Sequence, residues 1–286
     1  IRPYIDWTFF FLAWEMKASF PGILESPKYG KQARELLENA EALLQKMADE
    51  KLVTARAVYG FWPAHADGDD IVLYDDESRT SEKMRFNMLR QQRQKSREGK
   101  PYLCLSDFLT PAGSDIPDYL GAFAVTTGIG IDEHVRRFET QHDDYHAILL
   151  KALADRLAEA FAERMHERVR KEFWGYAAAE ELDNNALIKE QYQGIRPAPG
   201  YPACPDHTEK ALLWQLIDPL GRAGIDITEN FAMLPTASVS GWYFSHPQSG
   251  YFGLGKINRD QVVDYARRKN MTLEETERWL SPNLGY

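Results

Sequence analysis

Cysteine is nearly absent from this chain. Its 286 residues include only Cys104 and Cys204, which are too few for a disulfide framework or for a zinc site built from four thiolates. The sequence also carries no sign of export. We therefore expect a protein of a reducing compartment, the cytoplasm.

Long apolar runs are missing as well. The run near the start, residues 7–14, is interrupted by Thr8 and flanked by Asp6 and Glu15, and it is far shorter than the roughly 20 apolar residues that cross a bilayer. It predicts neither a membrane anchor nor a signal peptide. The chain starts on Ile1 rather than on methionine, directly before this aromatic segment, which indicates a domain taken from a longer protein.

Positive charge is in deficit. Lys and Arg number 34 against 43 Asp and Glu, giving a formal net charge of -9, so a nucleic-acid footprint would have to be a local patch. The densest basic run, residues 90–100, has no interleaved aromatic residues and is typical of a solvated connector. We expect neither a nucleic-acid partner nor a membrane partner.

The content of 44% hydrophobic and 27% charged residues is ordinary for a globular protein. Apolar spacing at three and four residues predicts helices, with Asn258 and Thr272 as N-caps and Gly175 ending the longest helix. The predicted helices span residues 28–50, 132–174, 208–216, 258–269 and 272–280. On the longest helix, Asp155, Glu159, Glu163 and His166 predict a solvated face rather than a catalytic carboxylate pair.

Short runs rich in aromatic and β-branched residues predict strands, and the turn at residues 67–70 predicts a hairpin. The predicted strands span residues 55–61, 71–74, 102–109, 118–126, 231–234, 238–244 and 251–254. Strands and helices do not alternate regularly, which favours an α+β fold with a mostly antiparallel twisted sheet, one long helix and flanking helices. With no strong linker in the sequence, residues 1–286 are predicted to form a single domain.

Residues 192–207 are the most unusual segment, because Pro197, Pro199, Pro202 and Pro205 exclude a helix and leave carbonyl groups without ladder partners. Within the segment, an arginine fork suits a carboxylate, an aromatic face suits a cation, and a glycine permits close backbone approach. These features favour a zwitterionic ligand with an extra positive charge. The alternative is a polyproline turn whose arginine makes a surface ion pair worth about 0–1 kcal/mol.

The string RPAPGYPACPDHTEK at residues 196–210, preceded by YQGI, resembles the signature of the activation domain of cobalamin-dependent methionine synthase. A second string, ASVSGWYFSHP at residues 237–247, is similar to the same family. Shorter matching segments lie at residues 4–7, 141–145, 152–163, 264–269 and 282–286. The resemblance covers essentially the whole chain.

That resemblance implies that the domain binds S-adenosylmethionine. Asp6 would accept a hydrogen bond from the ligand's ammonium group, Arg196 would hold its carboxylate or nearby polar atoms, and Tyr201 would lie near the sulfonium. Whether Glu159 and Glu190 also touch the ligand stays open.

The resemblance further assigns the backbone at Ala198 and Gly200 to the adenosine part, with Tyr251 and Phe252 completing the pocket. Phe252 departs from the family, which often has tyrosine at this position. A hydroxyl contact there is in doubt, whereas a backbone or stacking contact would survive.

The implied activity is repair of a methyltransferase. S-adenosylmethionine would supply a methyl group for reductive methylation of inactive cobalamin in methionine synthase, restoring methylcobalamin, with an electron from flavodoxin or a related flavoprotein. Cobalamin and zinc would be held only by other modules of the parent enzyme, one of which, the cobalamin-binding module, would be a partner. The domain would contribute orientation, have no catalytic residue and no metal of its own, and bind ligand without turnover when isolated.

Two alternatives remain open. The chain could be a separately encoded subunit that senses S-adenosylmethionine and docks on a cobalamin protein, which the upstream reading frame would decide. It could instead be a hydrolase that uses Cys204 and His207. The same two residues also resemble half a zinc site, but no matched second pair accompanies them.

Overall fold

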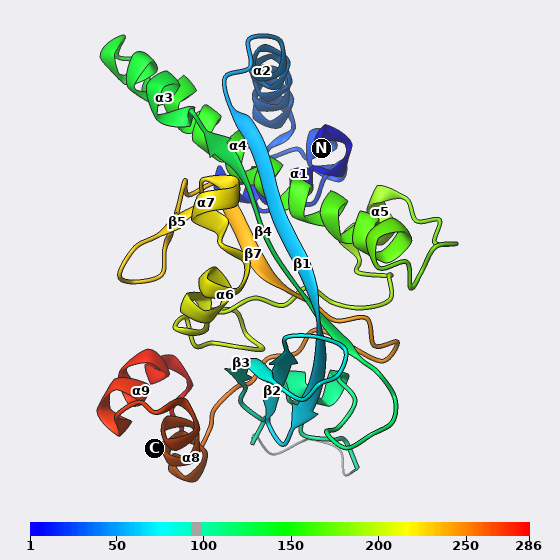
Figure 1. Ribbon diagram of the computed structural model, residues 1–286. Coiled ribbons are helices and arrows are strands. Elements are labelled where there is room, and N and C mark those ends of the chain that lie inside the picture. The colour runs from blue at the N-terminus through cyan, green and yellow to red at the C-terminus, as the bar shows by residue number, and fades with distance from the viewer. Residues whose placement is uncertain (93–98) are drawn as a thin grey trace.

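The computed structural model describes residues 1–92 and 99–286. Within these residues an antiparallel five-stranded sheet has the order β3-β2-β1-β4-β7, with helices on both faces (Figure 1). Its strands are β1 (Thr54–Asp67), β2 (Asp70–Tyr74), β3 (Glu82–Asn87), β4 (Tyr119–Ile129) and β7 (Ser238–Tyr243). A separate small ribbon pairs β5 (Asp226–Ile227) with β6 (Met233–Leu234). The predicted α+β class with antiparallel pairing is confirmed.

Strand β4 lies between β1 and the edge strand β7 and is buried along nearly its whole length. Phe123 and Val125 on one face pack with the long helix, whereas Ala122 and Ala124 on the other face join the larger core that contains Trp242. Alternate residues of a strand point to opposite faces. Because both faces are covered, β4 is a continuous apolar run rather than an alternating one.

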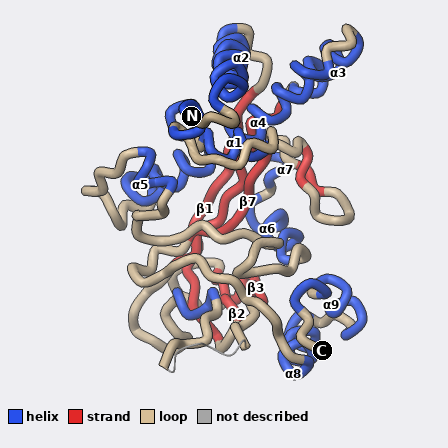
Figure 2. The backbone as a smooth tube through the Cα atoms, turned by 180° about the vertical axis from the view of Figure 1, so that it is seen from behind, coloured by secondary structure: helices blue, strands red, loops and turns tan. Residues whose placement is uncertain are grey.

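Helices enclose the sheet and extend beyond both of its ends. α2 (Gly30–Asp49) and α3 (Ile131–Thr140) project from one end, and α8 (Arg259–Lys269) and α9 (Leu273–Trp279) lie at the other (Figures 1 and 2). The remaining α-helices are α1 (Trp7–Ala13), α4 (Asp144–Arg168), α5 (Asn184–Ile188), α6 (Glu209–Ile217) and α7 (Pro219–Ala223).

The prediction of one unbroken helix over residues 132–174 is wrong. The helix is interrupted between α3 and α4. There His142 has a φ of 56°, and the Asp143 carboxylate accepts a hydrogen bond from the His146 amide at 3.2 Å. Apolar spacing continues through the break, so the local Asp cap outweighs the periodicity. α4 then passes into a π-helical turn, Val169–Phe173, before Gly175 ends the helical region with a φ of 77°.

Two predicted strands do not form. Residues 102–109 contain the short 3₁₀ helix Leu105–Phe108, because the Asp107 carboxylate accepts from the Cys104 amide at 2.8 Å and closes a turn. Residues 251–254 are irregular, and of residues 231–234 only Met233–Leu234 pairs as a strand. β3 was missed because it is largely polar and charged. The predicted hairpin forms as β1–β2, with Asp67 paired to Asp70 across the turn.

A buried charged cluster attaches the C-terminal helices to the segment before α6. The Lys269 ammonium lies 3.1 Å from an Asp206 carboxylate oxygen and also contacts Glu209, while the Tyr265 hydroxyl donates to Asp206 at 2.7 Å. Thr272 caps α9 as predicted, since its hydroxyl accepts from the Glu275 amide at 3.2 Å. This cluster fixes α8 and α9 to the segment that opens α6.

Two features of the structure concern the predictions about nucleic-acid and membrane partners. Of the basic run at 90–100, residues 93–98 lie outside the described residues, whereas Arg90 pairs with Asp69 and Asp107 at 2.7 Å each. Along the described chain, none of the helices combines the length and the apolar character that crossing a bilayer requires.

The helix break gives a direct test. Replacing Asp143 with alanine removes the α4 cap and should lower the free energy of unfolding by about 1 kcal/mol. Urea denaturation followed by circular dichroism measures the change. Asp132→Ala, in the first turn of α3, is the matched control and should change stability by less than about 0.5 kcal/mol. Equal effects of the two variants would show that Asp143 does not set the start of α4.

Candidate functional site

Two adjoining cavities, of ≈ 470 Å³ and ≈ 510 Å³, open between α4 and residues 192–207, called here the proline-rich loop. Glu159, Glu190, Arg196 and Tyr201 line both, so they form one continuous depression, called here the α4 groove. Each half is within the size range of small-molecule sites, about 300–1,000 Å³. The groove is the place where a ligand of two chemically different halves would fit.

One wall of the groove is a face of α4. Arg156, Glu159, Ala160 and Glu163 line it, and spacings of three, four and seven residues place them on one side of a helix. The prediction that this polar side is solvated is wrong for Glu163 and His166, which are 8% and 0% exposed. Sequence periodicity could not show this, because the covering loop comes from residues 192–207.

The opposite wall is the proline-rich loop, which is attached to β7. Ile195 and Phe244 exchange backbone hydrogen bonds of 3.0 Å, and the Trp242 amide donates to the Pro197 carbonyl at 2.9 Å. A Cβ on Gly241 would lie 2.4 Å from that same carbonyl oxygen, so only glycine permits this approach. The two unusual sequence strings are therefore physical neighbours.

Six of the seven predicted site residues line the groove. Asp6 and Arg196 lie in one half, and Ala198, Tyr251 and Phe252 lie in the other. Tyr201 lines both halves, as does Arg196.

Gly200 is the predicted residue that the groove lining does not include. It has a φ of 88° and its amide donates to the Cys204 carbonyl at 2.8 Å, so this amide already has a partner within the loop. A Cβ there would lie 2.2 Å from the His207 ring.

Arg196 is the most highly connected residue of the groove. Its Nη2 lies 2.8 Å from a Glu163 carboxylate oxygen, and its Nη1 donates to the Tyr192 hydroxyl at 2.8 Å and to His166 Nδ1 at 3.2 Å. Burial alone lowers the pKa of Arg196, but Glu163 and the other surrounding groups outweigh it and raise the pKa. A guanidinium has five N–H donors. These contacts use three of them and leave one on Nη2 and the one on Nε for a ligand.

Tyr251 fixes the same arginine from its backbone side. The Tyr251 hydroxyl accepts from the Arg196 amide at 3.0 Å and lies 3.4 Å from the Tyr192 hydroxyl. Phe252 is an edge-on neighbour of Phe108, with ring centroids 6.3 Å apart. Contacts to neighbouring residues therefore hold both Tyr251 and Phe252, the aromatic residues of this side of the groove, in place.

Asp6 is at the start of α1. One carboxylate oxygen accepts from the Thr8 amide at 2.8 Å and caps the helix. This contact orients the side chain at the groove, and the second oxygen remains as an acceptor. Asp6, in the Tyr-Ile-Asp-Trp string, therefore both caps α1 and lines the groove.

The half of the groove that contains Asp6 is acidic. Its lining carries four carboxylates (Asp6, Glu159, Glu163 and Glu190) and two guanidiniums (Arg156 and Arg196). Burial raises the pKa of Glu190, with Arg196 opposing it. A cationic ligand would meet a complementary field here.

Several residues that line the groove were not predicted from the sequence. Tyr4, Phe9, Arg156, Leu187 and Ile188 come from α1, α4, α5 and the first turn of the chain. Phe9 is 57% exposed despite its size. The signal available in the sequence was the almost wholly apolar segment of residues 7–13, of which only Phe10 and Phe11 are buried.

The cysteine–histidine pair does not form a reactive site. Cys204 is 4% exposed, and burial together with Glu209 and Asp206 holds the pKa of its thiol well above the usual value. The thiolate that a nucleophile or a zinc ligand requires is therefore disfavoured. Among residues 1–92 and 99–286 no group of three or more His, Cys, Asp or Glu side chains is placed to hold a metal ion.

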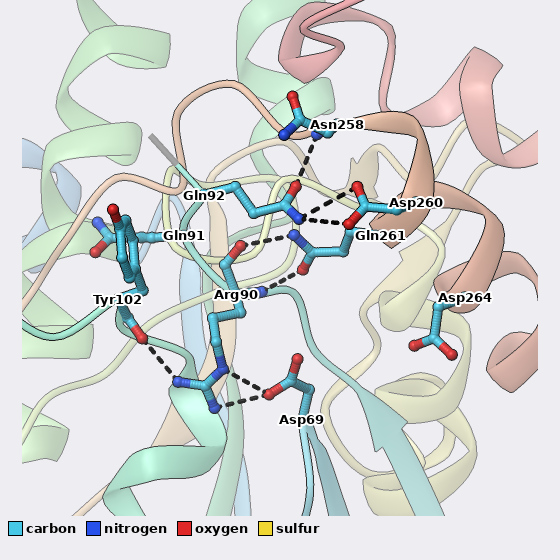
Figure 3. A pocket seen from close by; sticks show the side chains of 9 residues that line it. All are labelled: Asp69, Arg90, Gln91, Gln92, Tyr102, Asn258, Asp260, Gln261 and Asp264. Atoms are coloured by element: carbon cyan, nitrogen blue, oxygen red, sulfur yellow. Dashed lines mark hydrogen bonds and ion pairs between the residues drawn. The ribbon is translucent and has the colours of Figure 1, made fainter. Parts of the chain in front are cut away.

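A separate cavity, of ≈ 490 Å³, lies near α8 (Figure 3). Its polar groups bind one another: Gln261 accepts from the Arg90 amide at 2.6 Å and donates to the Arg90 carbonyl at 2.8 Å, and Gln92 accepts from the Asn258 amide at 2.7 Å. These bonds attach α8 to the segment after β3. Their role is structural, so the α4 groove is the better candidate site.

The loop geometry predicts that Gly200→Ala is destabilising. The added methyl group meets the His207 ring at a positive φ, which should cost about 1–3 kcal/mol of the free energy of unfolding. Thermal and urea denaturation measure this cost. Gly250→Ala is the matched control, because a Cβ there has no atom within 4 Å, and it should be nearly neutral. A neutral Gly200→Ala variant would contradict the described turn.

His166 predicts a pH dependence of stability. Burial first, then Arg196 and Arg170, hold its pKa well below the usual value. Below about pH 6.5 the histidine binds a proton in the unfolded chain but not in the folded chain. Its contribution to the free energy of unfolding is therefore fully present above that pH and is lost as the pH falls. Between about pH 6.5 and 5, wild type should lose up to ~1.4 kcal/mol per pH unit more than His166→Asn in urea titrations. Parallel slopes would show that His166 is protonated in the folded state.

Comparison with known proteins agrees with the fold. Residues 1–270 match the family model for the activation domain of vitamin B12 dependent methionine synthase. A crystal structure of the MetH reactivation domain bound to AdoHcy is similar with a TM-score of 0.96 and 55% sequence identity, over 100% of this chain and 87% of that chain. The resemblance found in the sequence is confirmed, and the chain belongs to the family of activation domains of vitamin B12-dependent methionine synthase.

Proposed function

We propose that this domain binds S-adenosylmethionine in the α4 groove and presents its methyl group for reductive methylation of cobalamin in methionine synthase. The observation that carries the proposal is the convergence of Asp6, Arg196, Tyr201 and Tyr251 on one groove. The similar reactivation domain with AdoHcy bound supports the ligand class.

The amino-acid part of the ligand is assigned to the acidic half of the groove. Asp6 offers a carboxylate oxygen to the ammonium group, and Arg196 offers its remaining Nη2 and Nε donors to the carboxylate. The sulfonium carries a positive charge, which the electron-rich face of Tyr201 and the surrounding carboxylates favour. Glu159 and Glu190 line both halves and add to this field.

The adenosine part is assigned to the half formed by the proline-rich loop. This half contains the backbone of Ala198 and the side chains of Val239, Tyr251 and Phe252. Flat apolar surfaces suit a purine, and loop carbonyls suit its amino group. Gly200 contributes by holding the turn rather than by direct contact, which modifies the role that the resemblance implied for it. Phe252 contributes ring area without a hydroxyl.

The chemistry asks little of this chain beyond binding and orientation. Cobalamin supplies the nucleophile that takes the methyl group, so no general base of the domain is required. The domain holds the sulfonium methyl in a fixed position, which lowers the entropic part of the barrier. We propose the cobalamin-binding module of the same enzyme and a flavodoxin-like reductant as partners, and binding without turnover for the isolated domain. The assignment of residues 1–286 to one domain of a larger enzyme stays a prediction.

Arg196→Ala and Asp6→Asn should each weaken binding of S-adenosylmethionine at least tenfold, because each removes a charge-assisted contact worth about 1.5–3 kcal/mol. Isothermal titration of the purified chain measures the effect, with S-adenosylhomocysteine as a second ligand. Asp6→Asn should reduce the preference for the sulfonium ligand, because it removes negative charge from the groove.

Arg168→Ala is the control for these variants, since this arginine, the last residue of α4, pairs with Glu172 at 2.8 Å and neither residue lines the groove. It should bind the ligand as wild type does. Saturable binding that Arg196→Ala and Asp6→Asn leave unchanged would place the ligand outside the α4 groove.

A further inference from the structure

His166 lies next to the groove without lining it. It follows Glu163 by one turn of α4 and is 0% exposed. Its ring stacks on Tyr243, with centroids 5.4 Å apart and an interplanar angle of 15°, and meets the Tyr192 ring edge-on at 4.9 Å. Two aromatic neighbours therefore fix the plane of the imidazole.

The contact with Arg196 fixes the tautomer of this histidine. Arg196 Nη1 lies 3.2 Å from His166 Nδ1, and a guanidinium can only donate. Nδ1 must therefore accept, which places the ring proton on Nε2. That nitrogen lies 3.5 Å from the Tyr176 hydroxyl.

The surrounding charges require the neutral form. Arg170 is fully buried and pairs with Glu180 at 2.7 Å, and Arg196 pairs with Glu163 at 2.8 Å. These four charges sum to zero around the imidazole. A proton on His166 would add an uncompensated positive charge between two arginines, at a high desolvation cost.

We propose that His166 is a positioning residue, a neutral acceptor that holds the Arg196 guanidinium in the orientation that receives the ligand's carboxylate. The inference rests on the proposed function, because it assigns a role within the same binding site. Glu163 supplies the counter-charge on Nη2, and the Tyr192 hydroxyl takes the second Nη1 hydrogen. His166 fixes the orientation of the guanidinium plane, which neither Glu163 nor Tyr192 fixes by itself.

The effect should depend on the ligand. Without an acceptor at Nδ1, one Nη1 hydrogen is left buried without a partner. The guanidinium then gains by rotating toward Glu163 in a two-armed pair, which withdraws donors from the groove. Ligands with the amino-acid carboxylate lose affinity, whereas a ligand without it does not.

The test uses variants of this chain and three ligands. His166→Leu removes the acceptor, and His166→Asn keeps an amide oxygen near the position of Nδ1. Each variant is titrated calorimetrically with S-adenosylmethionine, with S-adenosylhomocysteine, and with 5′-methylthioadenosine, which lacks the amino-acid carboxylate. Circular dichroism confirms that each variant is folded at the titration temperature.

His166→Leu should weaken both carboxylate-bearing ligands about tenfold or more and leave 5′-methylthioadenosine unchanged, and His166→Asn should restore binding to within about threefold of wild type. Wild-type affinity in His166→Leu, or an equal loss for all three ligands, would overturn the positioning role while leaving the proposed function intact. Failure of the wild-type chain to bind S-adenosylmethionine would overturn both.

A second measurement does not depend on the leucine variant. Nitrogen-15 NMR of histidine rings in the ligand-free wild-type chain distinguishes the two neutral tautomers. A neutral His166 ring protonated on Nε2 supports the role. A ring protonated on Nδ1, or on both nitrogens near neutral pH, is incompatible with Arg196 donating to Nδ1 and rejects it.

Discussion

The ion pair between Arg196 and Glu163 is the contact on which the groove depends. It joins the proline-rich loop to α4 at 2.8 Å, and these two elements are the two walls of the groove. Glu163 is 8% exposed, so removing either partner would leave a buried charge that costs several kcal/mol. The loop can be rich in proline and poor in ladder hydrogen bonds because this pair, and the backbone bonds to β7, hold it in place.

Buried charge serves different purposes at two places in the molecule. Near α8 the cluster of Asp206, Glu209, Lys269 and Tyr265 closes on itself and attaches the C-terminal helices. In the α4 groove, Arg196 contacts Glu163, His166 and Tyr192, and we propose that its remaining N–H donors bind the ligand. Preorganised donors bind more tightly because their orientation is set before the ligand arrives. The two clusters therefore differ in one respect: the cluster near α8 is closed on itself, whereas Arg196 has N–H donors that its protein partners do not use.

The sequence predicted what depends on local pattern. The fold class, the β1–β2 hairpin and the end of the long helical region at Gly175 follow from periodicity and turn residues. The break at residues 141–143 was missed because one capping aspartate outweighed a continuing apolar pattern. The buried states of Glu163 and His166 could not be predicted, because the loop that covers them comes from a distant segment of the chain. For the site, the resemblance supplied residues, and the fold supplied the contacts among them.

The most direct test of the account is a crystal structure of this chain grown with S-adenosylmethionine or S-adenosylhomocysteine. We expect the amino-acid part of the ligand between Asp6 and Arg196, its sulfur beside Tyr201 and its purine against the proline-rich loop, with the Arg196–Glu163 pair kept. A ligand bound elsewhere, such as the cavity beside Arg90, or a ligand in the groove with its carboxylate turned away from Arg196, would contradict it.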